Sequence, residues 1–199
     1  TQAAGKIPVS FEGVDTMSLT AHKFYGLNGI GLLIKRRNLA LEPLIHGGES
    51  TTIYRSGTPT VALASSLACA LDLAVTDLPG RVDHVAKLNA ELRAALSTYP
   101  LVRINSPDHA VPHVLNLSVQ NVKGTVFQRE LDAKGVCVSV KSACSSDGLP
   151  SRAVFAVSRD RRNALSSWRI SLSHLTTEDE IKAFLQAFDV CYRELTAVH

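Results

Sequence analysis

The chain has 199 residues, of which 45% are hydrophobic and 20% charged, a composition typical of a globular protein with a packed core. Its formal net charge is only +3, and its one short basic run, Lys35 to Arg37, is expected to be a solvated strand end, so direct binding to nucleic acid is not predicted. Four unevenly spaced cysteines contain no CxxC pair, so neither a metal site nor a disulfide framework is predicted.

The first part of the chain predicts one strand and two helices. Gly29 to Ile34 is continuously apolar, which predicts a strand packed on both faces. Thr58 to Val75, with Pro59 in its first turn, predicts a helix that is apolar almost all round and therefore buried, but too short to cross a membrane. Arg81 to Ser97 predicts an amphipathic helix, and Pro79-Gly80 is expected to break the chain before it. We therefore divide the chain into residues 1–75 and 76–199.

The second part predicts short strands that alternate with helices. The segment Thr125 to Lys134 predicts a helix that Gly135 ends. The sequence "TTEDE" predicts the capped start of a last helix, whose apolar residues line one face. The four expected strands are Leu101–Ile104, Val114–Val119, Val136–Val140 and Trp168–Leu172. This pattern indicates an α/β or α+β protein.

Lys23 is the first candidate for chemistry. It follows His22 and lies close to Thr20, so a reactive amine would have two neighbours able to hold a phosphate. A solvated Lys-His pair is the alternative from these residues alone. Similarly, Thr58 in "YRSGTP" comes before an expected helix N-terminus, where free N–H groups favour an anion; a simple N-cap explains it equally well.

Cys144 is the one cysteine whose surroundings favour reactivity. It lies among small polar residues in "SVKSACSSDG", where access is expected to be good and Lys141 is near enough in sequence to favour the thiolate. Cys69, Cys137 and Cys191 lie in apolar runs and are expected to be small core residues.

Arg169 lies between Trp168 and Ile170 on an expected strand. Its planar guanidinium suits a carboxylate, which is either an internal Asp or Glu or the carboxylate of an amino-acid substrate.

Together, and in this order, these segments resemble the cysteine desulfurases, which are pyridoxal 5′-phosphate (PLP) enzymes of the class V aminotransferase group and fold-type I. The family's Ser-x-His-Lys is matched by residues 20–23, and its Tyr-Gly-x-x-Gly-Ile-Gly by residues 25–31. The segments "RSGTP", "VPHVLNLSV", "SACSS" and "SSWRISL" follow in family order, so the resemblance covers nearly the whole chain. It implies an α/β fold that combines the tail of the PLP-binding large domain (1–75) with the α+β small C-terminal domain (76–199).

The resemblance assigns roles to the residues of the first part. Lys23 would carry PLP as a Schiff base and later move protons on the substrate. Thr20 and His22 would hold the cofactor phosphate, and Thr58 would reach the phosphate of a partner subunit in a homodimer. Gln2 matches a glutamine that contacts the ring hydroxyl.

The resemblance also implies a reaction. Arg169 would bind the carboxylate of L-cysteine, and Cys144 would take the substrate sulfur as a persulfide while alanine is released. The Ser-rich surroundings of Cys144 are similar to those of the branch that passes sulfur to iron–sulfur scaffold proteins or tRNA-thiolation enzymes. A cytoplasmic protein without a membrane partner is expected, since no secretory signal is visible.

Three departures from the family pattern affect the expected activity more than the fold. The aspartate that pairs with the pyridine nitrogen would fall before Thr1, with the family's entire front part, so this chain alone is expected to be inactive and to expose apolar surface around residues 1–75. Glu49 replaces a glycine and Thr51 a glutamate of the family's His-Gly-Gly-Gly-x-Glu, and Lys141 replaces a glycine before Ser-Ala-Cys.

Two alternatives stay open. The protein could be another class V PLP aminotransferase or lyase, in which Cys144 is incidental. It could also be a non-catalytic truncated paralogue that acts through dimerisation or by binding the sulfur acceptor.

Overall fold

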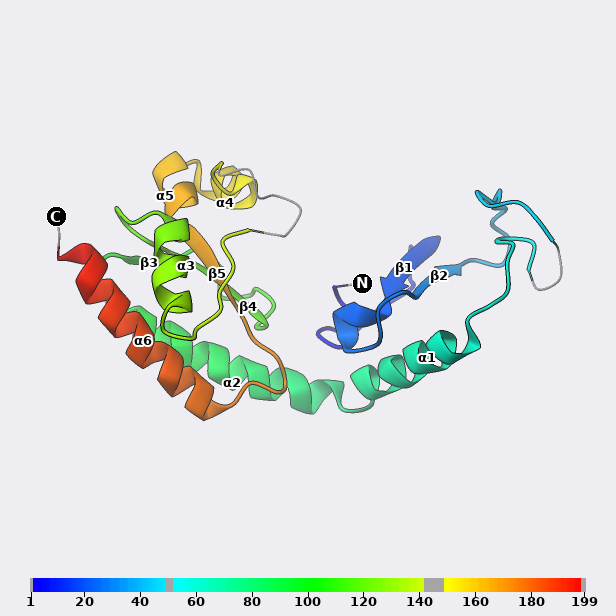
Figure 1. Ribbon diagram of the computed structural model, residues 1–199, viewed down its shortest axis with the longest axis horizontal. Coiled ribbons are helices and arrows are strands. Elements are labelled where there is room, and N and C mark those ends of the chain that lie inside the picture. Colours follow the sequence, from blue (N-terminus) through cyan, green and yellow to red (C-terminus); the bar gives the residue numbers. More distant parts are fainter. Residues whose placement is uncertain (1, 49–51, 142–148, 198–199) are drawn as a thin grey trace. The chain divides into compact units, whose positions relative to one another are not determined.

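The computed structural model describes residues 2–48, 52–141 and 149–197 (Figure 1). The chain divides into two compact units, Thr1–Pro79 and Gly80–His199, close to the division into residues 1–75 and 76–199 that was expected around Pro79-Gly80. Each unit has its own hydrophobic core.

The first unit is a two-stranded antiparallel ladder with helices. Strands β1 (Thr16–Thr20) and β2 (Gly31–Lys35) pair so that Thr20 lies opposite Gly31, and the 3₁₀ helix η1 (Ala21–Phe24) begins directly after β1. Helix α1 (Val61–Thr76) and the segment before β1 supply the rest of the small core. The core residues of this unit are Ala4, Leu19, Ala21, Phe24, Leu67 and Ala74.

Two expectations for this unit are wrong. The strand is not packed on both faces, because Leu32 and Ile34 lie against the core while Leu33 is 55% exposed. Helix α1 begins at Val61 instead of Thr58 and is mostly exposed along its length. The reason is that two strands and one helix can bury only one face of each element. The expected apolar surface is confirmed, with Leu44 97% exposed.

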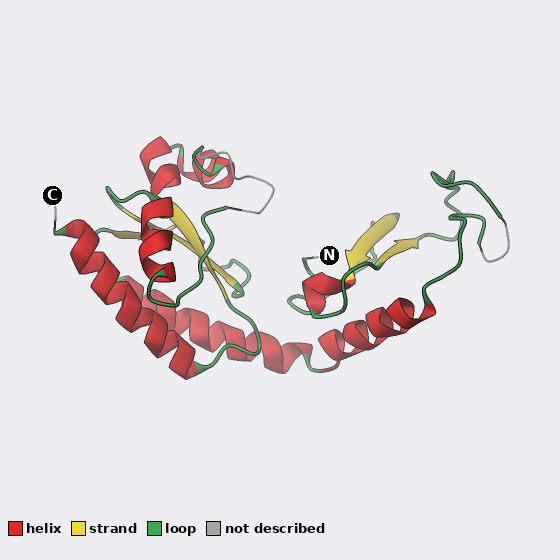
Figure 2. Cartoon of the chain, viewed as in Figure 1, coloured by secondary structure: helices red, strands yellow, loops and turns green. Residues whose placement is uncertain are grey.

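The second unit is an antiparallel sheet of order β3-β4-β5 with helices (Figure 2). In it, Val102 lies opposite Val119, and Leu117 lies opposite Trp168. The elements in chain order are α2 (Leu78–Leu96), β3 (Val102–Ile104), β4 (Val114–Val119), α3 (Gly124–Asp132), α4 (Arg152–Ser158), α5 (Arg161–Ser166), β5 (Ser167–Ser171) and α6 (Glu178–Thr196).

The two faces of this sheet differ in chemistry because side chains alternate along each strand. Leu115, Leu117, Trp168 and Ile170 are buried in a core that α2, α3 and α6 complete. The residues between them are polar: Asn116 and Ser118 on β4, and Ser167, Arg169 and Ser171 on β5. The polar face is therefore the side of the sheet that can carry a site.

The last helix is confirmed in detail. Thr177 caps α6 by accepting from the Glu180 backbone N–H, and the Glu180 carboxylate accepts from the Thr177 N–H at 2.8 Å. Ile181, Phe184 and Phe188 of its apolar face are buried.

Two further expectations are wrong, and two helices were missed. The run 136–140 is not a strand, because only Ser139 forms a β-bridge, opposite Arg169. Pro79 does not break the chain: it is the second residue of α2, where its missing N–H leaves no helical bond unmade. The break between helices α1 and α2 lies at Asp77 instead. The short helices α4 and α5 were not predicted.

Within the described residues, no single helix is long and apolar enough to cross a membrane; only α1 and α2 taken together, as a bent pair, reach that length and composition.

Candidate functional site

The geometry of η1 decides where Lys23 points. In a 3₁₀ helix, residues three apart lie on the same side, and Ala21 and Phe24 are both buried. His22 and Lys23 therefore lie on the exposed side of the turn. Gly26 completes the turn, since a Cβ there would lie 2.7 Å from the Ala21 Cβ.

The hydroxyl of Thr20 fixes the ring of His22. Thr20 donates to the carbonyl oxygen of Ile30 at 3.3 Å, and its Oγ1 lies 3.2 Å from His22 Nδ1. The tautomer of His22 decides whether its Nδ1 donates to the Thr20 hydroxyl or accepts from it. The Nε2 atom of His22 remains for an external group. The structure therefore brings Thr20, His22 and Lys23 together on one turn.

Lys6 is a neighbour of this turn that the sequence analysis did not single out. Its Nζ donates to the carbonyl oxygens of Gln2 at 3.4 Å and Lys23 at 3.5 Å. Burial first, and the positive charge of Lys23 second, lower the pKa of Lys6 from its usual value. Within the described residues, no carboxylate pairs with Lys6 or Lys23. The uncompensated charge favours an anionic ligand.

The other predicted residues of the first unit are less closely grouped. Gln2 joins the turn through its main-chain oxygen. Thr58 is exposed, in an irregular segment, and the N-cap of α1 is Thr60, so the simple N-cap reading of Thr58 is wrong. Glu49 and Thr51 lie outside the described residues, as does Cys144 in the second unit.

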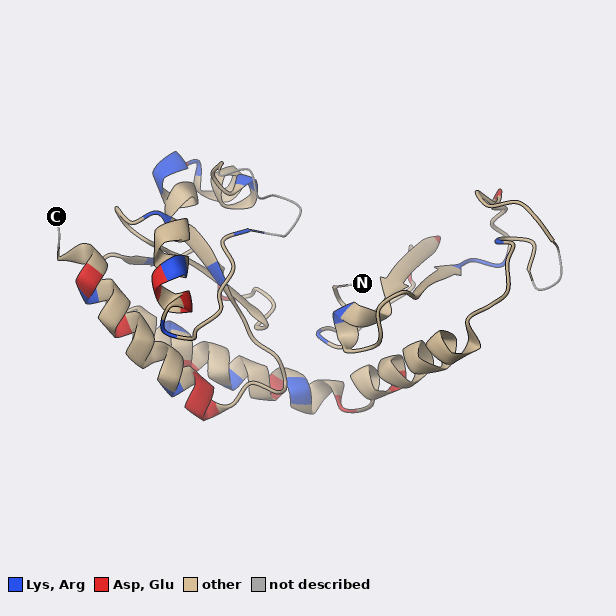
Figure 3. Cartoon of the chain, viewed as in Figure 1, with Lys and Arg blue, Asp and Glu red and all other residues tan. Residues whose placement is uncertain are grey.

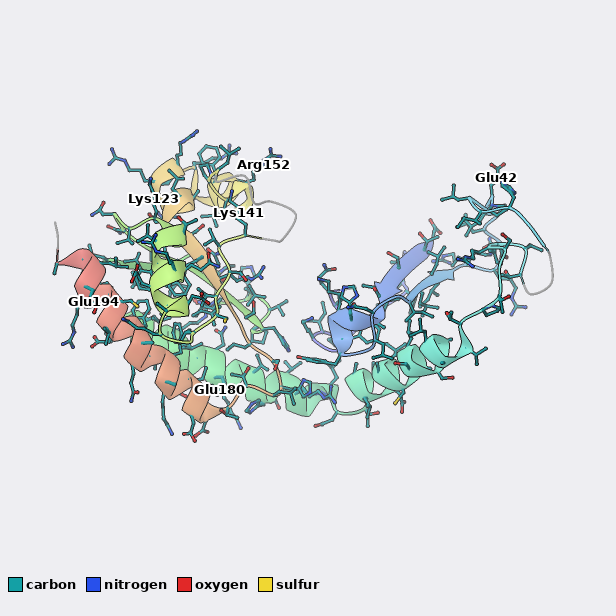
Figure 4. The ribbon with its side chains drawn as sticks, in the orientation of Figure 1. Glu42, Lys123, Lys141, Arg152, Glu180 and Glu194 are labelled. Atoms are coloured by element: carbon teal, nitrogen blue, oxygen red, sulfur yellow. The ribbon has the colours of Figure 1, made fainter. Side chains whose placement is uncertain are left out.

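The second unit contains a cavity of about 970 Å³ on the polar face of its sheet. Four basic side chains line it, and no acidic residue is among the described residues of its lining. Lys141 and Arg152 of this lining are labelled in Figure 4. Basic residues also mark α4 and α5, whereas α6 carries many of the acidic ones (Figure 3). The four basic lining residues are Arg103, Lys141, Arg152 and Arg169.

Arg169 lies on β5, and its guanidinium is fixed through Nε. Its Nε donates to Ser171 Oγ at 3.1 Å. In the part of the chain that the structure describes, no Asp or Glu pairs with it, so the alternative of an internal carboxylate partner finds no support there. Its two terminal nitrogens can therefore bind a carboxylate in the cavity.

The cysteines differ from the expectation that three of them are core residues. Cys69 and Cys137 are free and exposed, while Cys191 is free and buried in the core of the second unit. Burial raises the pKa of the Cys191 thiol, which lowers its thiolate fraction at neutral pH.

Thiol alkylation should separate these residues. We expect iodoacetamide at neutral pH to label Cys69 and Cys137 within minutes, and Cys191 at least about tenfold more slowly, because access and thiolate fraction both limit the reaction. Peptide mass spectrometry gives the rate at each site, and the urea-unfolded chain is the control in which all sites react. Equal rates for Cys191 and Cys69 in the folded chain would contradict the core described above.

Residues 1–184 match the family described as "Aminotransferase class-V", so the chain belongs to the class-V aminotransferase family. Among curated relatives, it is 33% identical to "Cysteine desulfurase IscS" of Dictyoglomus turgidum, over 99% of this chain and 51% of that protein. It is 35% identical to "Cysteine desulfurase, mitochondrial" of Eremothecium gossypii, over 94% of this chain and 39% of that protein.

Solved structures support the same fold. A NifS-like protein superposes with a TM-score of 0.85 at 33% identity, over 98% of this chain and 51% of that one. A NifS-like protein of Rickettsia africae superposes with a TM-score of 0.84 at 29% identity, over 96% of this chain and 51% of that one. The expected relation to fold-type I enzymes and cysteine desulfurases is confirmed. The chain spans between 39% and 51% of the length of the relatives named here.

The chemistry of the η1 turn fits the cofactor on which this family generally depends. PLP carries an aldehyde, which requires a lysine amine, and a phosphate, which requires positive charge and hydrogen-bond donors. Lys23 supplies an exposed amine, and Lys6 supplies a charge without a carboxylate partner within the described residues. The donors of the turn therefore suit both groups of the cofactor.

Proposed function

We propose that the whole protein is a PLP-dependent cysteine desulfurase. The observation that carries this proposal is the similarity of the chain, over 99% of its length, to a protein named as a cysteine desulfurase. The basic cavity around Arg169 supports it, because an amino-acid substrate has a carboxylate to bind there.

The roles of the residues follow from their positions. Lys23 would hold the cofactor through its amine, and would move a proton at the substrate Cα. His22 and Thr20 would hold the phosphate, with Thr58 reaching that of a partner subunit. Gln2 would contact the ring hydroxyl. When bound, PLP supplies the electron sink that lets bonds of the substrate amino acid break.

Arg169 and Cys144 would act on the substrate itself. The terminal nitrogens of Arg169 would bind the carboxylate of L-cysteine. The sulfur would leave Cβ of L-cysteine and bond to Cys144 Sγ, so that L-cysteine and the thiol give L-alanine and an enzyme persulfide. The atoms balance without an external oxidant. The persulfide sulfur would then pass to an iron–sulfur scaffold or a tRNA-thiolation enzyme.

The assembly and compartment are also proposals. The exposed apolar side chains of the first unit favour a homodimer, because such surface is normally covered. The described cysteines are free thiols, which agrees with a reducing compartment such as the cytoplasm.

Cys144→Ser in the whole, cofactor-loaded protein tests the sulfur transfer. We expect release of sulfide with a thiol reductant to fall by at least about a hundredfold, because serine cannot accept the sulfur. The control is Cys69→Ser, which changes an exposed thiol and should leave the rate unchanged. An unchanged rate in Cys144→Ser would reject the persulfide step. A keto acid in place of alanine as the product would instead support an aminotransferase.

A further inference from the structure

A chain of hydrogen bonds runs behind Asn116 on the polar face of the sheet in the second unit. Asn163 Nδ2 donates to Asn105 Oδ1 at 2.9 Å. Asn105 Nδ2 lies 2.9 Å from Asn116 Oδ1 and 2.8 Å from Ser118 Oγ. Ser118 Oγ in turn donates to the carbonyl oxygen of Asn163 at 3.0 Å. Asn163 and Ser118 are both buried, so this network is held within the fold.

The direction of every bond follows from one atom. A backbone carbonyl can only accept, so the single hydrogen of Ser118 is used on Asn163. Ser118 Oγ must therefore accept from Asn105, which puts the amide nitrogen of Asn105 on that side. The second hydrogen of that nitrogen goes to Asn116, so the atom of Asn116 that faces Asn105 is its oxygen. The Asn116 nitrogen, Nδ2, then faces away from the network.

Asn116 and Arg169 are direct partners across β4 and β5, so their side chains lie on the same face. The main-chain N–H and C=O of Arg169 bond to Ser139 at 2.7 and 3.1 Å, and the Asn116 carbonyl accepts from Asn105 and Ser106. The main-chain N–H and C=O groups of Asn116 and Arg169 therefore do not bond to each other. The two residues are a non-hydrogen-bonded pair, the arrangement with the closest side chains, at about 4.5 Å between Cα atoms.

Both residues line the cavity of about 970 Å³. In the described part of the chain, Asn116 Nδ2 has no hydrogen-bond partner. The site thus offers the two terminal nitrogens of Arg169 and one amide N–H beside them, all of them donors. A carboxylate has about four lone-pair sites on two oxygens, so it can accept from both residues at once.

We propose that Asn116 is a second ligand of the substrate carboxylate beside Arg169, and that Asn105 is the residue that positions it. This inference rests on the proposed function, since it deepens the carboxylate site assigned there to Arg169. Asn105 does not touch the substrate: it holds the Asn116 oxygen, so that the nitrogen points to the carboxylate. The site then selects a planar carboxylate over a neutral amide, because the NH₂ group of an amide cannot accept from the donors of Arg169 and Asn116.

Asn116→Asp tests the first part on the 199-residue chain. The substitution keeps the acceptor for Asn105, removes the donor to the cavity and adds a negative charge. We expect the Kd of sodium acetate, measured by NMR shifts of the amide groups around the cavity, to rise at least about tenfold, the low end for a hydrogen bond to a charged group. In the unchanged chain, the Asn116 side-chain NH₂ resonances should shift with acetate and not with acetamide.

Asn121→Asp is the charge-matched control. Asn121 lies in the turn after β4, is exposed and does not line the cavity. Its left-handed backbone conformation, with φ of 67°, is one that aspartate tolerates. The fluorescence of Trp168 confirms that each variant is folded, and Asn116→Ser replaces Asn116→Asp if the latter unfolds. An acetate affinity equal to that of Asn121→Asp would overturn the role of Asn116.

Asn105→Asp tests the positioning role. The new carboxylate has no hydrogen for Asn116 and attracts its NH₂ group, which turns the amide over and presents its oxygen to the cavity. Because a new charge also weakens anion binding, the comparison is a double-mutant cycle. We expect the loss of acetate affinity caused by Asn105→Asp to be at least about threefold larger in the unchanged chain than in an Asn116→Ala background. Equal losses would overturn the positioning role.

Arg169→Ala separates this inference from the proposed function. If it leaves the acetate affinity unchanged, the carboxylate site assigned to Arg169 is wrong. If it weakens binding at least about tenfold while Asn116→Asp matches its control, only the role of Asn116 is wrong.

Discussion

Lys23→Ala in the whole, cofactor-loaded protein is expected to abolish the visible absorbance that a lysine-bound PLP gives, and to lower alanine production from L-cysteine by about 10²–10⁴-fold or more. The reason is that Lys23 is the exposed amine on the η1 turn, next to the donors of His22 and Thr20. Alanine cannot bond to the aldehyde or move a proton. Absorbance and product release give two independent measurements of the same change.

Lys87→Ala is the control for this prediction. Lys87 is an exposed lysine on α2, outside both candidate sites, so its loss removes one positive charge and no function. We expect its absorbance and rate to match those of the unchanged protein. A Lys23→Ala protein that keeps the absorbance would show that another amine binds the cofactor. Lys6 would then be the first residue to examine, since its Nζ lies 3.5 Å from the Lys23 carbonyl oxygen.

Local sequence signals predicted the elements that carry their own start and stop residues. The last helix has the capping residues Thr177 and Glu180 and a long apolar stripe, and it forms with both halves of the capping box. Helices α4 and α5 have only seven and six residues, too few for a helical period to appear in the sequence. Apolar content alone predicted a strand at residues 136–140, but a strand there needs a neighbouring strand edge to pair with, and only Ser139 forms such a bridge.

In the candidate site, too, only groupings of residues that are neighbours in sequence could be predicted. A motif of neighbours in sequence, such as residues 20–23, can be recognised because one turn holds it together. Lys6 gave no signal, because its relation to Lys23 is made by the fold of an irregular segment. Asn116 faces Arg169 only through the register of β4 and β5, which depends on pairing between distant parts of the chain. Contacts of this kind cannot be read from spacing.

Phe188→Ala is expected to destabilise the second unit by about 3–5 kcal/mol, the range for deleting a buried aromatic ring. Phe188 lies on α6, is 0% exposed and stands at the centre of a ring cluster. Its centroid is 5.0 Å from that of Tyr99, 5.3 Å from Phe127, 5.9 Å from Phe184 and 6.2 Å from Trp168. Alanine would leave a cavity among rings that α3, β5, α6 and the turn after α2 hold apart, so the core cannot close fully around it.

Urea unfolding followed by tryptophan emission measures this loss in the right unit, because Trp168 is the only tryptophan of the chain and is itself in the cluster. Phe155→Ala is the matched control: the same change on α4 of the same unit, at a ring that is 42% exposed. Its expected cost is below about 1 kcal/mol, since much of the ring already lies in water. If both variants unfold at the same urea concentration, the ring cluster is not the core on which the second unit depends. The polar face with Asn116 and Arg169 would then lack the rigid support that its proposed donors require.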